Sequence, residues 1–115
     1  RIDWRRTAPH PGPPRYRMAA GLDPATGGLL FLGGSENPYN FNGIGYDGRP
    51  SPASARAQAY DLGSDRWREL QPLPQASMDH RGLATIGGLH YLIGGMRNGQ
   101  QVTGDVMRFN PVPGP

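Results

Sequence analysis

The stretch LLFLGG at residues 29–34 returns as HYLIGG at residues 90–95, and a glycine pair precedes each copy. A short apolar run bounded by glycines is typical of a strand buried on both faces. Similar residues surround both copies, so the chain holds one supersecondary unit twice. Such a unit cannot bury its own faces alone and must stack on neighbours. The repeat therefore predicts the architecture, and we expect the chain to need further copies of the unit.

Each unit is expected to hold four short strands. The first unit supplies strands at 17–22, 29–32 and 57–60 and a fourth centred on Trp67, which ends at Pro72 because proline cannot donate to a ladder. The second unit supplies strands at 81–86, 90–93 and 106–109. Trp4 matches Trp67 and is expected to mark a lone fourth strand. The predicted parts are this strand with a linker (1–14), a complete unit with a long loop at 35–55 (15–76), and a partial unit of three strands (77–115).

The two units differ in length at one place. The interval between the double glycines, from Gly34 to Gly95, is longer than the interval from Tyr60 to Phe109, the residues that close the third strands. The difference predicts an insertion of roughly a dozen residues after the first double glycine. Loops of this length are uncommon in compact domains unless they are functional or disordered. The first strands are aligned on the arginines that open them, Arg17 and Arg81.

The composition favours an all-β protein. Only 36% of the 115 residues are hydrophobic, and the 18 glycines and 13 prolines lie at fixed offsets around the apolar runs, as turn formers do. No window has a helical period, and no apolar run approaches the roughly 18 residues of a membrane span. The chain begins at Arg1 with no apolar segment behind it, so we expect a piece of a longer sequence rather than a signal peptide.

The charge excludes some partners. All 12 basic residues are arginine, the net charge is +3, and cysteine is absent. The absence of cysteine removes disulfides, thiolate metal sites and cysteine nucleophiles, although it does not indicate a compartment. Nucleic-acid binding would need the arginines on one face. They are instead scattered along the chain, apart from three near the N-terminus, so we expect neither a nucleic-acid nor a membrane partner.

The order of these elements resembles the kelch repeat over about residues 3–111. The resemblance is carried by the arginine that opens the first strand, the double glycine, the aromatic residue that closes the third strand, and the tryptophan of the fourth strand. It implies an all-β fold of β-propeller blades, each a four-stranded antiparallel sheet of about 50 residues. Propellers close with four to eight blades, and this chain supplies about two. The missing blades would come from a longer polypeptide or from identical copies, one copy lending its Trp4 strand to the next.

The insertion is the segment in which recognition is expected. In kelch propellers the corresponding loop often projects onto the ligand-binding face, and tyrosine with asparagine, glycine and arginine is a recognition-loop composition. The alternative is a loop packed on itself that only covers the edge of a blade. Alternating oxygens at Asn40, Asn42 and Asp47 resemble calcium ligands, but too few carboxylates are present, and we expect no metal and no cofactor. The loop candidates are Glu36, Asn37, Tyr39, Asn40, Phe41, Asn42, Tyr46, Asp47 and Arg49.

A second group of candidates lies near the start of the second unit. Asp79 and His80 could act as an acid–base pair, but neighbouring residues of a strand point to opposite faces. Arg17 and Arg81 are expected to bond carboxylates or carbonyls, or else to bind an anion in the channel. Arg97 is a further binding candidate. No residue is predicted to be catalytic.

Two functions follow from the resemblance. The first is a binding or scaffold module that recognises a protein or a glycan through its blade loops. The second is a propeller enzyme that acts on a sugar, similar to sialic-acid epimerases, for which Asp79, His80, Arg81 and Arg17 would be the candidates. A galactose-oxidase-type copper centre is excluded, because it needs a cysteine.

Overall fold

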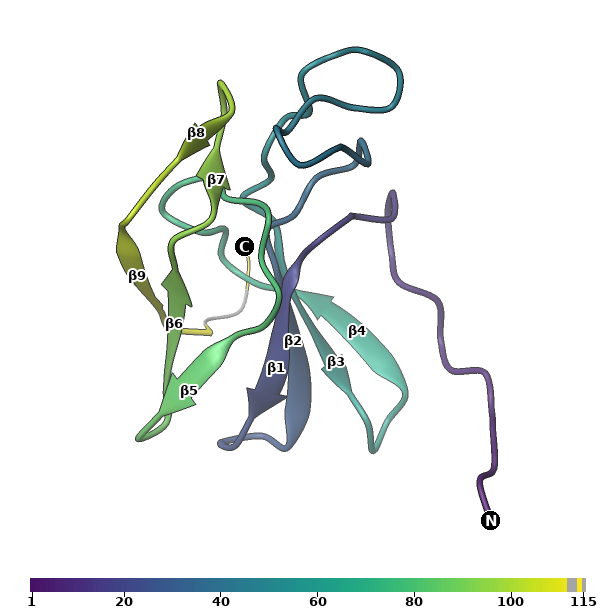
Figure 1. The fold of residues 1–115 in the computed structure, drawn as a ribbon. Coiled ribbons are helices and arrows are strands. Elements are labelled where there is room, and N and C mark those ends of the chain that lie inside the picture. The colour runs from purple at the N-terminus through teal and green to yellow at the C-terminus, as the bar shows by residue number, and fades with distance from the viewer. Residues whose placement is uncertain (112–113, 115) are drawn as a thin grey trace.

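The computed structural model describes residues 1–111 and 114 and shows an all-β chain (Figure 1). Nine strands are present in this part of the chain, and all of them pair antiparallel. Among the same residues, no helix is long and apolar enough to cross a membrane. The predicted all-β class with antiparallel sheets is therefore confirmed.

The first sheet has four strands in the order of the sequence. They are β1 (Ala19–Asp23), β2 (Gly28–Leu32), β3 (Ala57–Asp61) and β4 (Arg66–Glu69). Each joins the next through a tight turn, except that the long loop separates β2 from β3. The first turn is built on Asp23, whose carboxylate accepts hydrogen bonds from the backbone N–H of Ala25 and the hydroxyl of Thr26. This sheet lies within the predicted complete unit.

The second sheet repeats the first without its outer strand. It consists of β5 (Ala84–Ile86), β6 (Leu89–Ile93) and β9 (Val106–Phe109). A small hairpin of β7 (Met96–Arg97) and β8 (Gln101–Val102) stands in place of the long loop, and the sequence analysis did not anticipate it. The outer edge of β9 carries no strand within the described residues.

The core lies between the two sheets. Alternate residues of the first sheet, including Leu30, Leu32 and Ala59, pack against Leu92 and Phe109 of the second. The alternation is required by the pleat, which sends successive side chains to opposite faces. A polar contact accompanies the apolar ones, because the buried His90 places Nε2 3.4 Å from a carboxylate oxygen of Asp23.

The opposite face of the first sheet carries an aromatic cluster. The ring of Trp67 lies 5.0 Å from Tyr60 and 5.2 Å from Phe31 between ring centres. The N-terminal segment crosses this face: Trp67 donates its indole N–H to the carbonyl of Ala8 over 2.8 Å, and His10 packs edge-on against the indole.

The strand expected around Trp4 is not formed in the single chain. Residues 1–10 carry no strand, and Trp4 is 89% exposed. The segment before Ala8 extends away from the sheets in Figure 1. Its assignment as the fourth strand of another blade stays a prediction.

The expected alignment of Arg17 with Arg81 is wrong. Arg17 and Asp79 are the residues that share a left-handed backbone, with φ of 54° and 67°. The bridges that precede them, Tyr16 to Ser35 and Met78 to Met96, agree with this equivalence. Asp79 precedes Arg81 by two positions, and β5 begins five positions after Asp79, whereas β1 begins two positions after Arg17.

Candidate binding surface at the loop end

The loop at 35–55 is a compact set of turns rather than an extended flap. The backbone N–H of Asn40 donates to the carbonyl of Ile44, and that of Gly45 donates to the carbonyl of Arg49 over 2.7 Å. Asp47 accepts hydrogen bonds from the N–H of Arg49 and the amide of Asn37. These bonds favour the ionised carboxylate and hold the pKa of Asp47 below its usual range.

The loop is fastened to the hairpin of the second sheet. The Gln100 amide donates to the carbonyls of Gly43 and Ser51, and Asn98 accepts the backbone N–H of Ala53. Asn98 and Gln100 were not predicted from the sequence, because the hairpin that carries them was itself unexpected. Figure 1 shows the loop projecting beyond the same end of the sheets as β7 and β8.

The predicted loop residues divide into anchors and displayed side chains. Tyr39 is the anchor: its ring is buried and packs edge-on against Tyr16, with 5.0 Å between ring centres. Phe41 is 90% exposed and Tyr46 is 70% exposed, so two large aromatic side chains face the surroundings. Asn37 is half-buried, and the remaining loop candidates are exposed: Glu36, Asn40, Asn42, Asp47 and Arg49.

Beneath the loop, an ion pair joins the segment before β1 to the segment before β5. The Arg17 guanidinium donates to a carboxylate oxygen of Asp79 over 2.7 Å, and this bond raises the pKa of Arg17. The Tyr39 hydroxyl donates to the same oxygen over 3.3 Å. Arg17 also lies over the rings of Tyr16 and Tyr39, which are favourable positions for a cation. Arg81 is largely exposed, with Nη1 3.7 Å from Asp79.

His80 is held apart from Asp79. Its Nε2 lies 2.7 Å from the hydroxyl of Ser77, and both residues are buried. Burial lowers the pKa of His80, so the neutral ring is the favoured form at neutral pH. The neighbouring carboxylate of Asp79 is directed to Arg17 and Tyr39 instead. The two candidates for an acid–base pair therefore have separate partners, and the buried Ser77 is not accessible to a substrate.

Two further arginines, Arg97 and Arg15, have structural partners. Arg97 forms an ion pair with Asp105 beside the hairpin. Arg15, which the sequence analysis did not single out, is buried and donates to the carbonyl oxygens of Gly33 and Arg56 and to the Gln58 amide oxygen. Burial lowers the pKa of Arg15 to about 10.

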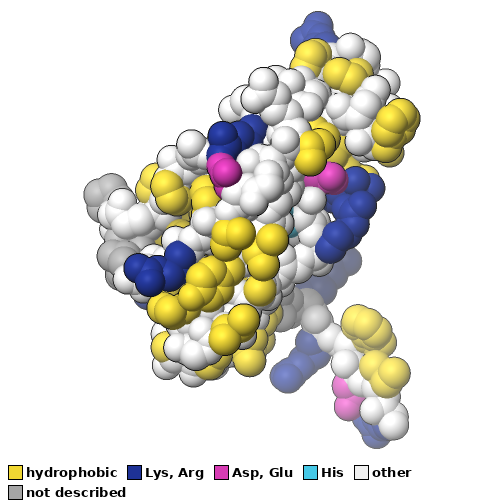
Figure 2. Space-filling view, turned by 60° about the vertical axis from the view of Figure 1, so that its left-hand side comes forward, with side chains coloured by type: hydrophobic (Ala, Val, Ile, Leu, Met, Phe, Trp, Pro, Cys, Tyr) yellow, Lys and Arg dark blue, Asp and Glu magenta, His cyan; other side chains and the backbone are white. Residues whose placement is uncertain are grey.

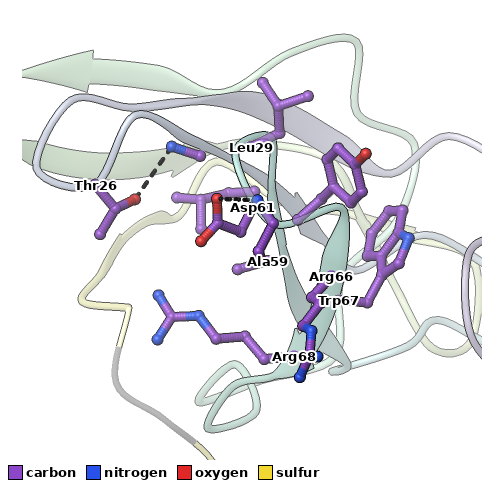
Figure 3. Close-up of a pocket in the computed structure, with 11 residues that line it drawn as sticks. Thr26, Leu29, Ala59, Asp61, Arg66, Trp67 and Arg68 are labelled. Carbon is purple, nitrogen blue, oxygen red and sulfur yellow. Dashed lines mark hydrogen bonds between the residues drawn. The ribbon is translucent and has the colours of Figure 1, made fainter. Parts of the chain in front are cut away.

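Two hollows are lined by residues outside the loop. One, of about 430 Å³, is on the face of the first sheet that is turned toward the second, near its outer edge (Figure 3). Its lining includes Thr26, Ala59, Asp61, Arg66 and Arg68. The other, of about 400 Å³, includes Asp79, His80, Tyr91 and Ile93 in its lining. Neither hollow is lined by any residue from 35 to 55.

Comparison with known proteins shows the fold alone. No family model matches the sequence, and no curated protein matches it. Among solved structures, YjhT superposes with a TM-score of 0.68 at 19% sequence identity. The match covers 94% of this chain and 34% of YjhT, so the chain spans about a third of the length of that structure.

Proposed function

We propose that the two sheets are neighbouring blades of a kelch-type β-propeller and that the chain is a binding module, which recognises a protein partner through the loop at 35–55. The blade assignment is supported by the repeated strand order and by the double glycines, whose backbone angles agree between the two sheets: Gly33 and Gly94 both have φ of 68°. The likeness to YjhT is compatible with the same architecture.

The exposure of Phe41 and Tyr46 is the observation that carries the binding proposal. A partner that covers an exposed aromatic ring removes its apolar surface from water, which favours binding. Aromatic side chains accordingly supply much of the binding free energy of protein interfaces. The backbone beneath them is fixed by its own turns and by Gln100, so binding needs little ordering of the loop.

The shape of the surface favours a protein over a small sugar. Small ligands occupy concave sites that bury most of their surface. The loop projects outward instead (Figure 1), and its residues line neither of the two hollows described above. The second hollow is lined by Asp79, His80 and Arg81, the candidates of the enzyme alternative. A sugar-acting enzyme has less support, because His80 bonds Ser77 rather than Asp79.

The test is a comparison of proteins retained by the immobilised full chain and by its variants Phe41→Ala and Tyr46→Ala. Proteins that bind the loop should be lost from both variants, and binding of a purified partner should weaken by at least roughly tenfold, as expected for an aromatic hot spot. The control is Leu62→Ala, which removes an exposed side chain from the turn between β3 and β4.

An unchanged set of retained proteins in both loop variants would overturn the proposal. A glycan panel provides the second arm, with immobilised oligosaccharides as the probe. Retention of a glycan that depends on Phe41 would replace the protein partner with a sugar.

A further inference from the structure

The second sheet has an open position where the first sheet has its fourth strand. In the first sheet, β4 pairs with β3 so that Trp67 lies opposite Tyr60. Phe109 of β9 corresponds to Tyr60, because the two residues pair with His90 and Leu29 at matching places of β6 and β2. A strand added to β9 in the same register would therefore set one residue directly opposite Phe109.

The larger hollow, lined by Thr26 and Ala59, is the space that we assign to that side chain. Phe109 points toward the first sheet and packs in the core with Leu30 and Ala59. Directly opposite residues of antiparallel strands share a face, so the residue opposite Phe109 would point the same way. Leu30 and Ala59 also line the hollow, together with Arg66 and Arg68 of β4. Figure 3 shows Thr26 and Trp67 at opposite sides of this view, with Ala59 between them.

A strand of matching sequence is present at the other end of the chain. From Trp4 the sequence is WRRTAPHP, and from Trp67 it is WRELQPLP, with the tryptophan, the arginine and both prolines in identical places. Trp4 and Ile2 are largely exposed, so the segment is free to pair. Residues 3–6 correspond to β4, which places Trp4 opposite Phe109.

We propose that residues 3–6 of a second copy of this chain pair with β9 and insert Trp4 into this hollow. The indole would contact Phe109 and Leu30 and lie near the guanidinium groups of Arg66 and Arg68, which favour an aromatic face. The free edge of β9 would gain the backbone partners that an exposed strand lacks.

The same arrangement covers two exposed apolar faces. The outward face of the second sheet carries Ile86, Leu89, Ile93 and Val106, and hydrophobic side chains gather over it in Figure 2. The copy that lends Trp4 would bring the outward face of its own first sheet, with Leu22 and Phe31, against these residues, because its N-terminal segment leads directly into that sheet. The interface is heterologous, so it closes into a ring when the rotation allows.

The number of copies rests on the proposed propeller. Four to eight blades close a ring, and these 115 residues hold two sheets, so a ring built from this polypeptide alone would hold two to four copies. The mass of a chain is 12.5 kDa. Sedimentation of the full chain should therefore give a discrete species of two to four times this mass.

The first experiment compares the wild type with Trp4→Ala by sedimentation over a range of concentrations. Trp4 makes no core contact, so the variant should fold normally while the concentration needed for half-assembly rises at least roughly tenfold. Ile2→Ala is the matched control: it removes an exposed apolar side chain just before the paired residues and should change the midpoint less than roughly threefold. A monomeric wild type, or equal assembly of the wild type and Trp4→Ala, would overturn the proposal.

The second experiment tests the register. Pairing Trp4 with Phe109 sets Arg5 opposite Arg108, an exposed like-charge pair. Arg5→Glu and Arg108→Glu should each tighten assembly by roughly two- to fivefold, since each creates an opposite-charge pair. The double variant restores like charges and should lose the gain. Independent effects of the two substitutions would contradict the register. Loop binding is not involved in either readout, so the two proposals can fail separately.

Discussion

At the scale of single residues, the double glycines are needed because of their backbone and their surroundings together. Gly33 and Gly34 have φ of 68° and 88°, in the left-handed region that side chains rarely adopt. A Cβ on Gly33 would also press on the carbonyl oxygen of Ser77, and one on Gly34 would come within 2.8 Å of the carbonyl oxygen of Tyr16. The repeat is thus a place where two backbones meet closely.

We predict that Gly33→Ala lowers the free energy of unfolding by about 3 kcal/mol, from left-handed strain plus displacement of the Ser77 segment. Gly27→Ala is the control, because Gly27 has φ of 74° but no atom within 4 Å of a new Cβ. It should cost only the strain, about 1 kcal/mol. Urea unfolding measures both, and equal losses would mean that close contact with Ser77 contributes nothing.

Sequence reasoning worked for residues with strong local constraints. The apolar run before Gly33 forms a strand as predicted, and Phe109 ends β9 as expected, whereas β3 continues one residue past Tyr60 to Asp61. The expectation that Arg17 bonds a carboxylate is also confirmed, but the partner, Asp79, could not be named because it is distant in the sequence. Arg81 matches Arg17 by residue type, but Asp79 is the residue whose backbone conformation is equivalent to that of Arg17.

At the scale of elements, an error in the register between β1 and β5 changes the face on which each side chain lies as well as the ends of the strand. The pairings of Ala19 with Leu32 and of Ala84 with Tyr91 make Ala20 the equivalent of Leu83, whereas the alignment on arginines would match Ala20 to Ala84. A slip by one position moves every side chain of a strand to the other face. The alignment on arginines would therefore have exchanged the inner and outer faces of β5. The hairpin β7–β8 was missed because its two-residue strands carry no period that a sequence can show.

The Arg17–Asp79 pair links the linker before β1 to the linker before β5. Each side chain is 28% exposed, so solvent weakens the attraction but does not cancel it. We predict that Asp79→Asn lowers the free energy of unfolding by about 1 kcal/mol, because asparagine tolerates the left-handed backbone while the charge is lost. Arg81→Gln should change it by less than about 0.5 kcal/mol, since Arg81 is largely exposed. Thermal unfolding of both variants measures the difference, and equal losses would contradict a specific role for Arg17.

At the scale of the whole molecule, the two sheets respond to acid through different histidines. His10 packs on the first sheet, and burial together with the charge of Arg15 lowers its pKa. His80 lies at the start of the second sheet, where burial lowers its pKa. The carboxylates with lowered pKa values, Asp47, Asp65 and Glu69, lose their stabilising contributions only in more acidic solution.

We predict that the free energy of unfolding falls as the pH drops from 7.5 toward 5. The unfolded chain takes up protons on these histidines near pH 6.5, whereas the folded chain resists them until the pH passes the lowered pKa values, so protonation favours the unfolded state. Each histidine contributes a slope of at most about 1.4 kcal/mol per pH unit. His80→Met, which copies the equivalent Met18, and His10→Gln should each reduce the slope in urea unfolding measured across this range. A slope unchanged in both variants would assign the acid sensitivity to groups other than His10 and His80.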